Sequence, residues 1–519
     1  MRTSSGTALR TESRASRALL AAALIGSALV GLLPAVLSPS GAWVACAAAL
    51  TALAAVLLRR AWRGAALGAA QGGRTDPEST DRELAWDRRD WDLRWQRGLF
   101  YLGTLTVTES TFRPAFGLTL SELFFVVAFA GCVFAILRGH RVARVPALIV
   151  VGATLFALGG AISSLSAHSP EASGAEVLHA LYVMVVWAWT AAMVLRSRTQ
   201  ILFALSLWGV SAAANGLAAI AQVLGIDSLA GGLEGTRTTG FTEHPNDLGG
   251  VAAVALVPAL LLASRPNPGG LAVTRVLRWT IVGLIAVGLI LSASVASMLA
   301  ALVGLVVWLS SSAVRAPSRV ALVLALAAPL MVVAVIGGRI TSPSERLQQV
   351  TTDSATQGVS GSGEERIAIL EAAWPVIRQD PLVGTGLDDQ GKAITIFTNG
   401  QTRPYQIHGA PVAAWYEAGI LGLVGIVIVF WAYARTGWLA LRSSAGGDDL
   451  LIGWALLAAW VAFVVYALTV PFLFQQFGWF SGVVLVAWGL RREAVARVAE
   501  PVAIPGRAGA APFPTPLPR

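Results

Sequence analysis

Residues 412–434 read VAAWYEAGILGLVGIVIVFWAYA, an apolar run whose only charged side chain is that of Glu417. A helix that crosses the hydrocarbon core of a bilayer needs about 20 predominantly apolar residues. The run ends at Arg435, and similar runs recur along the whole chain. This stretch therefore predicts a membrane-spanning helix, and its repetition decides the fold class.

The composition agrees with a chain that lies mostly in a membrane. Of its 519 residues 55% are hydrophobic and only 13% are charged, whereas a soluble domain carries roughly a quarter charged residues. Apolar runs bounded by charge, Gly or Pro fall near 18–37, 42–58, 98–108, 119–137, 145–163, 177–195, 200–224, 247–264, 279–293, 296–313, 320–337, 412–434, 450–468 and 472–490, with the ninth and tenth divided at Ser292–Ser294. We therefore expect an all-α polytopic integral membrane protein with about 14 (12–14) transmembrane helices.

The basic residues predict how these helices are oriented. The formal net charge is +9, with 38 basic residues of which one, Lys392, is lysine. Flanks rich in arginine stay in the cytoplasm, and with the N-terminus inside, 30 of the 38 basic residues fall in cytoplasmic segments. We therefore expect a multi-pass protein of the cytoplasmic membrane with both termini cytoplasmic. The positive charge is then an orientation signal, and we expect no nucleic-acid partner.

The alternation of spans and loops divides the chain into five parts. Residues 1–97 are expected to form an N-terminal two-span addition with a cytoplasmic amphipathic loop, and residues 98–337 the membrane core. Residues 338–411 form one long extracytoplasmic loop between the eleventh and twelfth spans, with short helices and the active site. Residues 412–490 return to the membrane, and residues 491–519, rich in Ala and Pro, read as a disordered cytoplasmic tail.

Polar chemistry is concentrated in two outer segments and is scarce inside the spans. One is the loop IDSLAGGLEGTRTTGFTEHPND at 226–247, and the other is the long loop at 338–411. The sequence has no P-loop, no HExxH and no Cys/His metal cluster, so neither a metal nor another cofactor is expected. Chemistry or binding at the outer membrane face is the natural inference.

The first outer loop contains three candidate residues. Arg237 is the only basic residue in about fifty positions, and its guanidinium offers a rigid fork of donors that matches phosphate oxygens. The alternative for Arg237 is an anchor to lipid headgroups. Asn246 is well placed as the N-cap of the span that follows. For His244, beside Pro245, a structural hydrogen bond is favoured over a role as a base.

The second outer loop is expected to contain an amphipathic helix at 364–379 that stops before Asp380-Pro381. Its apolar positions, at a spacing of three to four, are Ile367, Leu370, Ala373, Trp374 and Ile377. Arg366 also sits on this helix. Arg378 falls near the C-terminus of the helix, where a cation is favourable in any case.

Two further candidates flank the start of the twelfth span. His408 lies just before it, and an imidazole at that depth can take a proton from a hydroxyl group. Glu417 lies about two helical turns inside the span. Because a buried carboxylate is costly in a membrane, Glu417 should pair with an outer-face arginine or polar group.

In order and spacing, these segments resemble the O-antigen ligase and O-antigen polymerase superfamily. The resemblance pairs GTRTTGFTEHPNDLGG (235–250) with RIAILEAAWPVIRQDPLVGTGLDDQG (366–391) and YQIHGAPVAAWYEAGILGLVG (405–425) across the large outer loop. It covers roughly residues 98–490. Two features depart from the family pattern: Gly409 stands where Asn usually follows the histidine, and the turn after the ninth span reads SASVAS, without the expected arginine.

The resemblance implies a GT-C-like glycosyltransferase that moves a glycan from a polyprenyl-diphosphate carrier to an acceptor glycan or lipid. By motif, Arg237 and Arg366 would bind the diphosphate in place of a metal, and His408 would activate or position the acceptor hydroxyl. Asn246, Glu417 and Arg378 are further candidates for substrate binding. Membrane lipids and a polysaccharide assembly machinery are the other partners that the resemblance implies.

Three alternatives stay open at this point. The motifs do not separate a ligase from a polymerase, although the Arg-, Ala- and Gly-rich composition favours a polymerase or ligase for exopolysaccharide or cell-wall glycan. A multi-span transporter or flippase for lipid-linked sugars has a compatible number of spans, but it should place ionisable residues in mid-span. A non-catalytic membrane scaffold would leave the arginines and the histidine unexplained.

Overall fold

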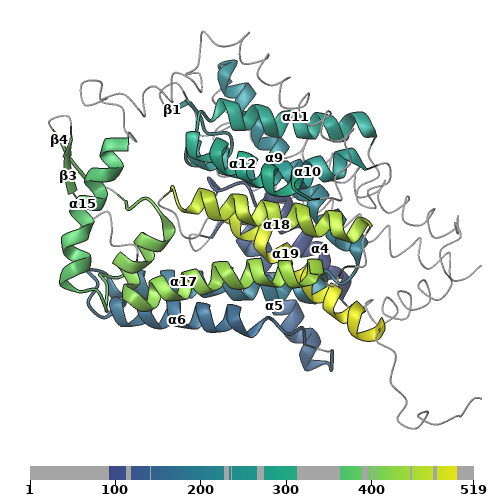
Figure 1. Cartoon of the computed structure of the whole chain (residues 1–519), viewed down its shortest axis with the longest axis horizontal. Helices are drawn as coiled ribbons and strands as arrows, with labels where there is room; N and C mark the ends of the chain where they lie inside the picture. The colour runs from purple at the N-terminus through teal and green to yellow at the C-terminus, as the bar shows by residue number, and fades with distance from the viewer. Residues whose placement is uncertain are drawn as a thin grey trace, which may run out of the picture.

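The computed structural model describes residues 93–499 apart from one long segment and several short ones. The segments outside the description are 113–117, 141, 227–232, 235–236, 266–273, 312–362, 388–394, 399–400, 405, 443, 445–446 and 471–475. Most of the described helices lie side by side along one direction, while α15 and the β3–β4 hairpin lie together at one end (Figure 1).

The helices follow the apolar runs of the sequence. Up to residue 223 they are α4 (Arg94–Thr106), α5 (Leu120–Leu137), α6 (Ala147–Ser164), α7 (Pro170–Leu181), the π-helical turn η2 (Tyr182–Val186), α8 (Trp187–Val194) and α9 (Arg198–Val223). After residue 244 they are α10 (Pro245–Ser264), α11 (Arg275–Leu291), α12 (Val295–Leu309), α15 (Gly363–Gln379), α17 (Ala410–Arg442), α18 (Asp448–Ala467) and α19 (Gln476–Ala499).

Seven helices in the described residues are long and apolar enough to cross a membrane. They are Leu120–Leu137, Ala147–Ser164, Pro170–Val194, Arg198–Val223, Pro245–Ser264, Ala410–Arg442 and Asp448–Ala467. The expectation of a mostly helical, polytopic membrane protein is therefore confirmed. The predicted break at Ser292–Ser294 is also confirmed, since α11 ends at Leu291 and α12 begins at Val295.

Other parts of the predicted topology stay predictions. The runs near 18–37, 42–58 and 320–337 lie outside the described residues, so the count of fourteen spans is untested. The run at 98–108 is helical in α4 as far as Thr106, and the described part of the run at 472–490 is helical in α19. Helix α19 continues to Ala499, into the segment read as a disordered tail.

Glycines bring α6 and α17 into close contact along their length. A methyl group at Gly152 would lie 2.9 Å from the carbonyl oxygen of Gly425. A methyl group at Gly159 would collide with the carbonyl oxygen of Ala418. Helices in a membrane associate through such small residues, because lipid is as apolar as the side chains and the gain comes from close packing. Helix α17, which carries candidate site residues, is therefore held backbone to backbone.

Aromatic side chains fill the centre between α17, α18 and α19. The rings of Tyr433 and Trp460 stack with centroids 4.7 Å apart, and the ring of Trp479 lies 5.7 Å from that of Trp460. The Tyr433 hydroxyl donates to the carbonyl oxygen of Met184 at 2.6 Å, and Trp460 Nε1 donates to that of Phe430 at 3.2 Å. Both buried polar groups are satisfied, as they must be where no water is present.

Two short hairpins interrupt the helical pattern, one before α10 and one before α17. Strand β1 (Leu233–Glu234) pairs with β2 (Arg237–Thr238), and β3 (Thr395–Thr398) pairs with β4 (Gln401–Pro404), both antiparallel. The expectation of an all-α chain is therefore wrong in this detail. These segments lack helical periodicity, and their backbone polar groups are satisfied by pairing strand to strand.

The two ends of the helix bundle differ in charge. At the end where α18 begins, Asp448 pairs with Arg198 and Arg265, and Asp449 Oδ2 lies 2.7 Å from Arg492 Nη1. We call this the arginine end. The opposite end, where α18 finishes at Ala467 and α10 begins at Pro245, contains the candidate residues, and we call it the site end.

Candidate active site

The loop that carries Arg237 is fixed to helix α9 by buried amides. Gln222 Oε1 accepts hydrogen bonds from the backbone N–H groups of Thr239 and Gly240, both at 3.0 Å. Asn215 Oδ1 accepts from the N–H of Phe241 at 2.9 Å. Gly240 adopts φ +61°, a conformation that glycine reaches without strain. Residues 239–241 of this loop are therefore held firmly against α9.

Arg237 is directed at the turn between α11 and α12. Its Nε donates to the carbonyl oxygen of Ser292 at 3.0 Å, and its Nη2 donates to Asn246 Oδ1 at 2.7 Å. The side chain is partly buried. The turn belongs to the SASVAS segment, in which Ser297 Oγ donates to the carbonyl oxygen of Asn246 at 3.3 Å. Two of the sequence candidates, Arg237 and Asn246, are thus in direct contact.

The start of α10 corrects the role expected for Asn246. The helix begins at Pro245, and its N-cap is His244, whose Nδ1 accepts a hydrogen bond from the N–H of Asn246 at 3.1 Å. The structural hydrogen bond expected for His244 is therefore confirmed, and the N-cap assignment to Asn246 is wrong. The Asn246 side chain instead orients the guanidinium of Arg237.

The C-terminal end of α18 connects the Arg237 segment with the His408 segment. The Tyr466 hydroxyl lies 3.0 Å from the carbonyl oxygen of Asn246 and 3.1 Å from Asp247 Oδ1. A few residues later, the carbonyl oxygen of Val470 accepts from the N–H of Gly409 at 3.0 Å. His408 and Asn246 therefore lie against the same helix end, although they are far apart in the sequence.

The backbone conformation at position 409 explains why this chain has glycine where the family motif has asparagine. Its φ is +102°, in the region that favours glycine. A methyl group there would lie 3.2 Å from the carbonyl oxygen of Leu468, so the position is also tight. In this chain a glycine after His408 lets the chain turn into α17 against the end of α18.

The PLVGTG segment at 381–386 closes a break in helix α17. Gly419 has φ 65° and ψ −165°, which interrupts the helix and frees backbone groups on both sides. The N–H groups of Thr385 and Gly386 donate to the carbonyl oxygens of Tyr416 (3.0 Å) and Glu417 (2.9 Å). On the other side of the break, the N–H of Ile420 donates to the carbonyl oxygen of Pro381 at 3.1 Å. The loop therefore replaces the missing helical bonds, which explains why the two motifs occur together.

The remaining candidates lie on either side of this junction. The predicted helix at 364–379 is confirmed as α15, which ends at Gln379. The backbone of Arg366 belongs to this helix, and the described part of the structure does not include its side chain. Arg378 places its guanidinium carbon 5.2 Å from the centre of the Trp374 ring. Glu417 is buried, with 6% exposed, and its pairing with an arginine or polar group stays a prediction.

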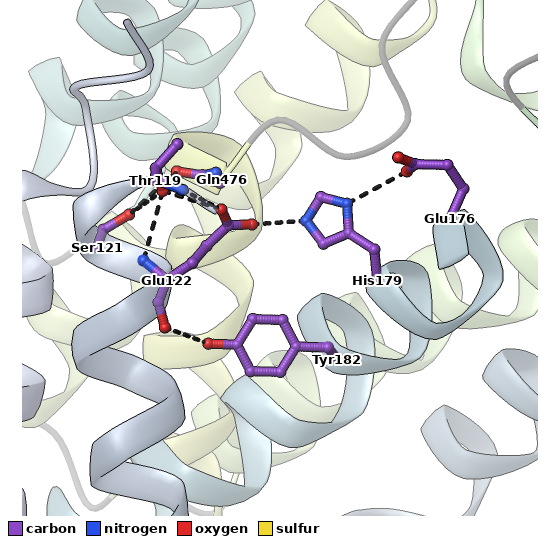
Figure 2. Close-up of polar contacts among 7 residues, drawn as sticks. All are labelled: Thr119, Ser121, Glu122, Glu176, His179, Tyr182 and Gln476. Carbon is purple, nitrogen blue, oxygen red and sulfur yellow. Dashed lines mark hydrogen bonds and ion pairs between the residues drawn. The ribbon is translucent and has the colours of Figure 1, made fainter. Parts of the chain in front are cut away.

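A second polar cluster at the site end involves groups whose contacts the sequence does not reveal. Figure 2 shows the imidazole of His179 between two carboxylates: Nε2 lies 2.6 Å from Glu122 Oε1, and Nδ1 lies 3.3 Å from Glu176 Oε2. The other oxygen of Glu122 accepts from the backbone N–H of Thr119 at 2.7 Å, which caps α5. The sequence places Glu122 and His179 near span ends, but nothing in it pairs residues 57 positions apart.

This cluster is tied to α19 and to the π-helical turn. Gln476 Oε1 accepts from the hydroxyls of Thr119 (2.9 Å) and Ser121 (3.0 Å) (Figure 2). The Tyr182 hydroxyl donates to the carbonyl oxygen of Glu122 at 2.7 Å. Because π-helical turns cost regular hydrogen bonding, they often mark functional regions. The cluster therefore fixes three helices at the site end.

Glu109 is a further carboxyl residue, partly buried, beside the Arg237 loop. Burial raises the pKa of Glu109 to about 7, against hydrogen bonds from Thr111 and from the N–H of Phe112 that lower it, and nearby Glu243 raises it further. Its segment joins the Arg237 loop where the N–H of Ser110 donates to the carbonyl oxygen of Phe241 at 3.3 Å. Among the described residues, no group of three or more His, Cys, Asp or Glu side chains is placed to hold a metal ion.

Comparison with known proteins finds a match for one part of the chain. Residues 280–427 match the family model of the O-antigen ligase domain. No curated protein matches the chain. The matched residues include the SASVAS turn, α15, His408 and the break in α17. The resemblance is thereby confirmed for this part of the chain: residues 280–427 match the O-antigen ligase family model, which supports the O-antigen ligase-like superfamily.

Proposed function

We propose that the protein is a polysaccharide polymerase or ligase that acts at the outer face of the cytoplasmic membrane. In this proposal it transfers a glycan from a polyprenyl-diphosphate carrier to an acceptor sugar hydroxyl. The observation that supports it most directly is the fixed guanidinium of Arg237, held by Ser292 and Asn246 at the edge of the O-antigen ligase domain. A pre-oriented cation at a membrane surface suits a diphosphate whose charge grows as the donor bond breaks.

The proposed reaction is a direct displacement at the anomeric carbon. The acceptor oxygen forms the new bond to this carbon, and the bond to the diphosphate oxygen breaks with its electron pair going to the diphosphate. Arg237 and Arg366 stabilise that negative charge, as a metal otherwise would, and His408 accepts the proton that the acceptor hydroxyl loses. Attack from the opposite face inverts the anomeric centre.

The other candidates have supporting roles in this proposal. Asn246 keeps the guanidinium of Arg237 in place through a 2.7 Å hydrogen bond, and a positioned donor is worth more than a mobile one. We propose Arg378 and Glu417 as contacts for the glycan or for the headgroup region. An exopolysaccharide or cell-wall glycan is the proposed product, made together with a polysaccharide assembly machinery.

The test uses the purified full chain in vesicles that contain a polyprenyl-diphosphate-linked glycan and an acceptor. We expect Arg237→Ala, Arg366→Ala and His408→Ala each to lower the formation of new glycosidic bonds by at least about tenfold. Losing one charge-assisted hydrogen bond in a transition state costs about 1.5–3 kcal/mol. Addition of EDTA should leave the wild-type rate unchanged.

The matched control is Arg275→Ala, which removes an exposed arginine from the opposite end of α11. It should keep the wild-type rate, and all variants should reach the membrane at equal levels. Wild-type yields from the three site variants would contradict the proposal. Movement of the lipid-linked glycan across the vesicle membrane without new glycosidic bonds would favour a flippase instead.

A further inference from the structure

Helix α15 has two apolar faces, and the described residues cover only one of them. Ile369, Ala373 and Ile377 are buried, with at most 4% exposed. Leu370 is 41% exposed and Trp374 is 42% exposed, and these two lie on the adjacent face. Leu382, just after the helix, is 69% exposed. We call Leu370, Trp374 and Leu382 the apolar strip.

The apolar strip contacts α17 through a pair of tryptophans, and this contact shows which part of α17 the strip lies beside. The rings of Trp374 and Trp415 meet edge to face, with centroids 5.8 Å apart and planes at 88°. The guanidinium carbon of Arg378 lies 5.2 Å from the Trp374 ring centre, and Trp415 Nε1 donates to the carbonyl oxygen of Pro381 at 3.0 Å. Along the axis of α17, the strip therefore lies at the same height as Trp415.

A second pair of the same kind lies near the arginine end of α17. The rings of Trp438 and Trp454 meet edge to face at 6.1 Å and 86°, and the guanidinium carbon of Arg442 lies 5.1 Å from the Trp438 ring centre. Between the two pairs, α17 exposes apolar side chains at Val424, Val427 and Trp431. An exposed apolar surface bounded at both ends by tryptophan and arginine is the pattern of a membrane span.

The spacing of the two pairs matches a bilayer. Trp438 follows Trp415 by 23 positions. The part from the break at Gly419 to Trp438 is continuous helix and spans about 28 Å. The hydrocarbon core is about 30 Å thick, and tryptophan rings prefer the headgroup level on either side of it. Trp415 and the apolar strip beside it therefore lie at the boundary between hydrocarbon and headgroups.

From this we infer that α15 is an interfacial helix whose apolar strip inserts into the bilayer at the site end. The occupant of the strip is the lipid surface: acyl chains contact Leu370, Trp374 and Leu382, and Arg378 lies level with the lipid phosphates. Such helices bury their apolar face by about 5–10 Å. The inference concerns the position of α15 and holds whether or not the protein transfers glycans.

The test measures how close single positions of α15 lie to lipid. Leu370→Cys and Ala372→Cys are made in the full chain with Cys46→Ala and Cys132→Ala, labelled with a small fluorophore and placed in phosphatidylcholine–phosphatidylglycerol vesicles. Ala372 is the matched control, because it is exposed on the same helix but points roughly opposite to the apolar strip. Leu382→Cys provides a second test position outside the helix.

Vesicles in which some lipids carry a nitroxide near the headgroup should quench the labels at 370 and 382 by at least about twofold, as insertion to this depth requires. The label at 372 should change little and should be quenched by iodide in water. Equal nitroxide quenching at 370 and 372 would overturn the inference, and so would quenching at neither. All variants should elute as a single species in detergent, which shows that they are folded.

Discussion

At the scale of single residues, Glu109 makes the stability of the site end depend on pH. Its pKa in the folded protein is about 7, raised from an ordinary value of 4.5 chiefly by burial. A raised pKa means that protonation favours the folded state. The stabilisation is complete below pH about 4.5 and is lost as the pH rises through about 7. We expect Glu109→Gln, which is neutral at every pH, to remove this dependence.

The measurement is the apparent melting temperature of wild type and Glu109→Gln in detergent from pH 4.5 to pH 8.5. The variant should gain stability relative to wild type as the pH rises through 7. Glu243→Gln should produce a smaller change of the same sign, because the charge of Glu243 is the weakest of the influences on the pKa of Glu109. A difference between wild type and Glu109→Gln that is constant across this range would contradict the assignment.

The start of α10 shows which features of single residues local sequence rules predict and which they do not. The interpretation of Asn246 as an N-cap followed its residue type, but Pro245 is the first helical residue, and proline is favoured at that position. The cap is therefore His244, one place before the proline. The contact between Asn246 and Arg237 has no local signal, because it forms across a loop turned by Gly240.

At the scale of elements, the break in α17 at Gly419 should depend on glycine. Its φ of 65° and ψ of −165° lie in a region that only glycine adopts readily, at a cost of about 1–3 kcal/mol for other residues. A methyl group there would also collide with the carbonyl oxygen of Leu382. We expect Gly419→Ala to destabilise the protein by at least that amount and to detach the PLVGTG segment from α17.

The comparison is Gly283→Ala in α11, where no atom lies within 4 Å of the added methyl group. That substitution should leave stability unchanged or raise it by about 0.5–1 kcal/mol. Limited proteolysis near residue 383 reports the detachment directly. Similar stability and similar cleavage for both variants would show that the break does not require glycine.

The cluster of Figure 2 yields a second prediction at this scale. Glu122 and His179 join α5 to α7 through a 2.6 Å contact, and the Glu122 side chain is 2% exposed. Removing one partner of a buried charged pair costs about 3–5 kcal/mol, so Glu122→Ala should lower the unfolding free energy strongly. A double-mutant cycle with His179→Ala should return a coupling of about 0.5–3 kcal/mol.

Glu176→Ala serves as the matched control on the same imidazole. Its carboxylate lies 3.3 Å from the ring and its side chain is 36% exposed, so its loss should cost no more than about 1 kcal/mol. Equal effects for Glu122→Ala and Glu176→Ala would mean that the buried contact is not the stabilising one. The readout is urea unfolding in mild detergent.

The secondary-structure elements agree with the sequence-based predictions where the apolar periodicity is strong. The helix at 364–379 appears at almost the expected bounds, because apolar spacing and the following proline are local signals. The β1–β2 and β3–β4 hairpins were not expected, since strands of two to four residues leave too little alternation to recognise. The π-helical turn at Tyr182–Val186 has no sequence signal that we can name.

At the scale of the whole molecule, the prediction concerns orientation. The arginine end should face the cytoplasm and the site end the outside, because arginine-rich flanks are retained inside. In a chain with Cys46→Ala and Cys132→Ala, Ser166→Cys at the site end should react with a membrane-impermeant maleimide in intact cells. Arg275→Cys at the arginine end should react only after the cells are opened. The reverse pattern would invert the topology and remove the proposed substrate from the site.

The sequence by itself determined that the chain is a helical membrane protein with an O-antigen ligase domain, because span length, charge and motif order are properties of local stretches. It also pointed to Arg237 and His408. Only the tertiary structure decided how these segments meet: Tyr466 and Val470 at the end of α18 join loops more than 150 residues apart, and the PLVGTG segment repairs the break at Gly419. The physical reason is that buried backbone and amide groups must form hydrogen bonds. Which group serves as the partner depends on how the helices pack and not on the neighbouring sequence.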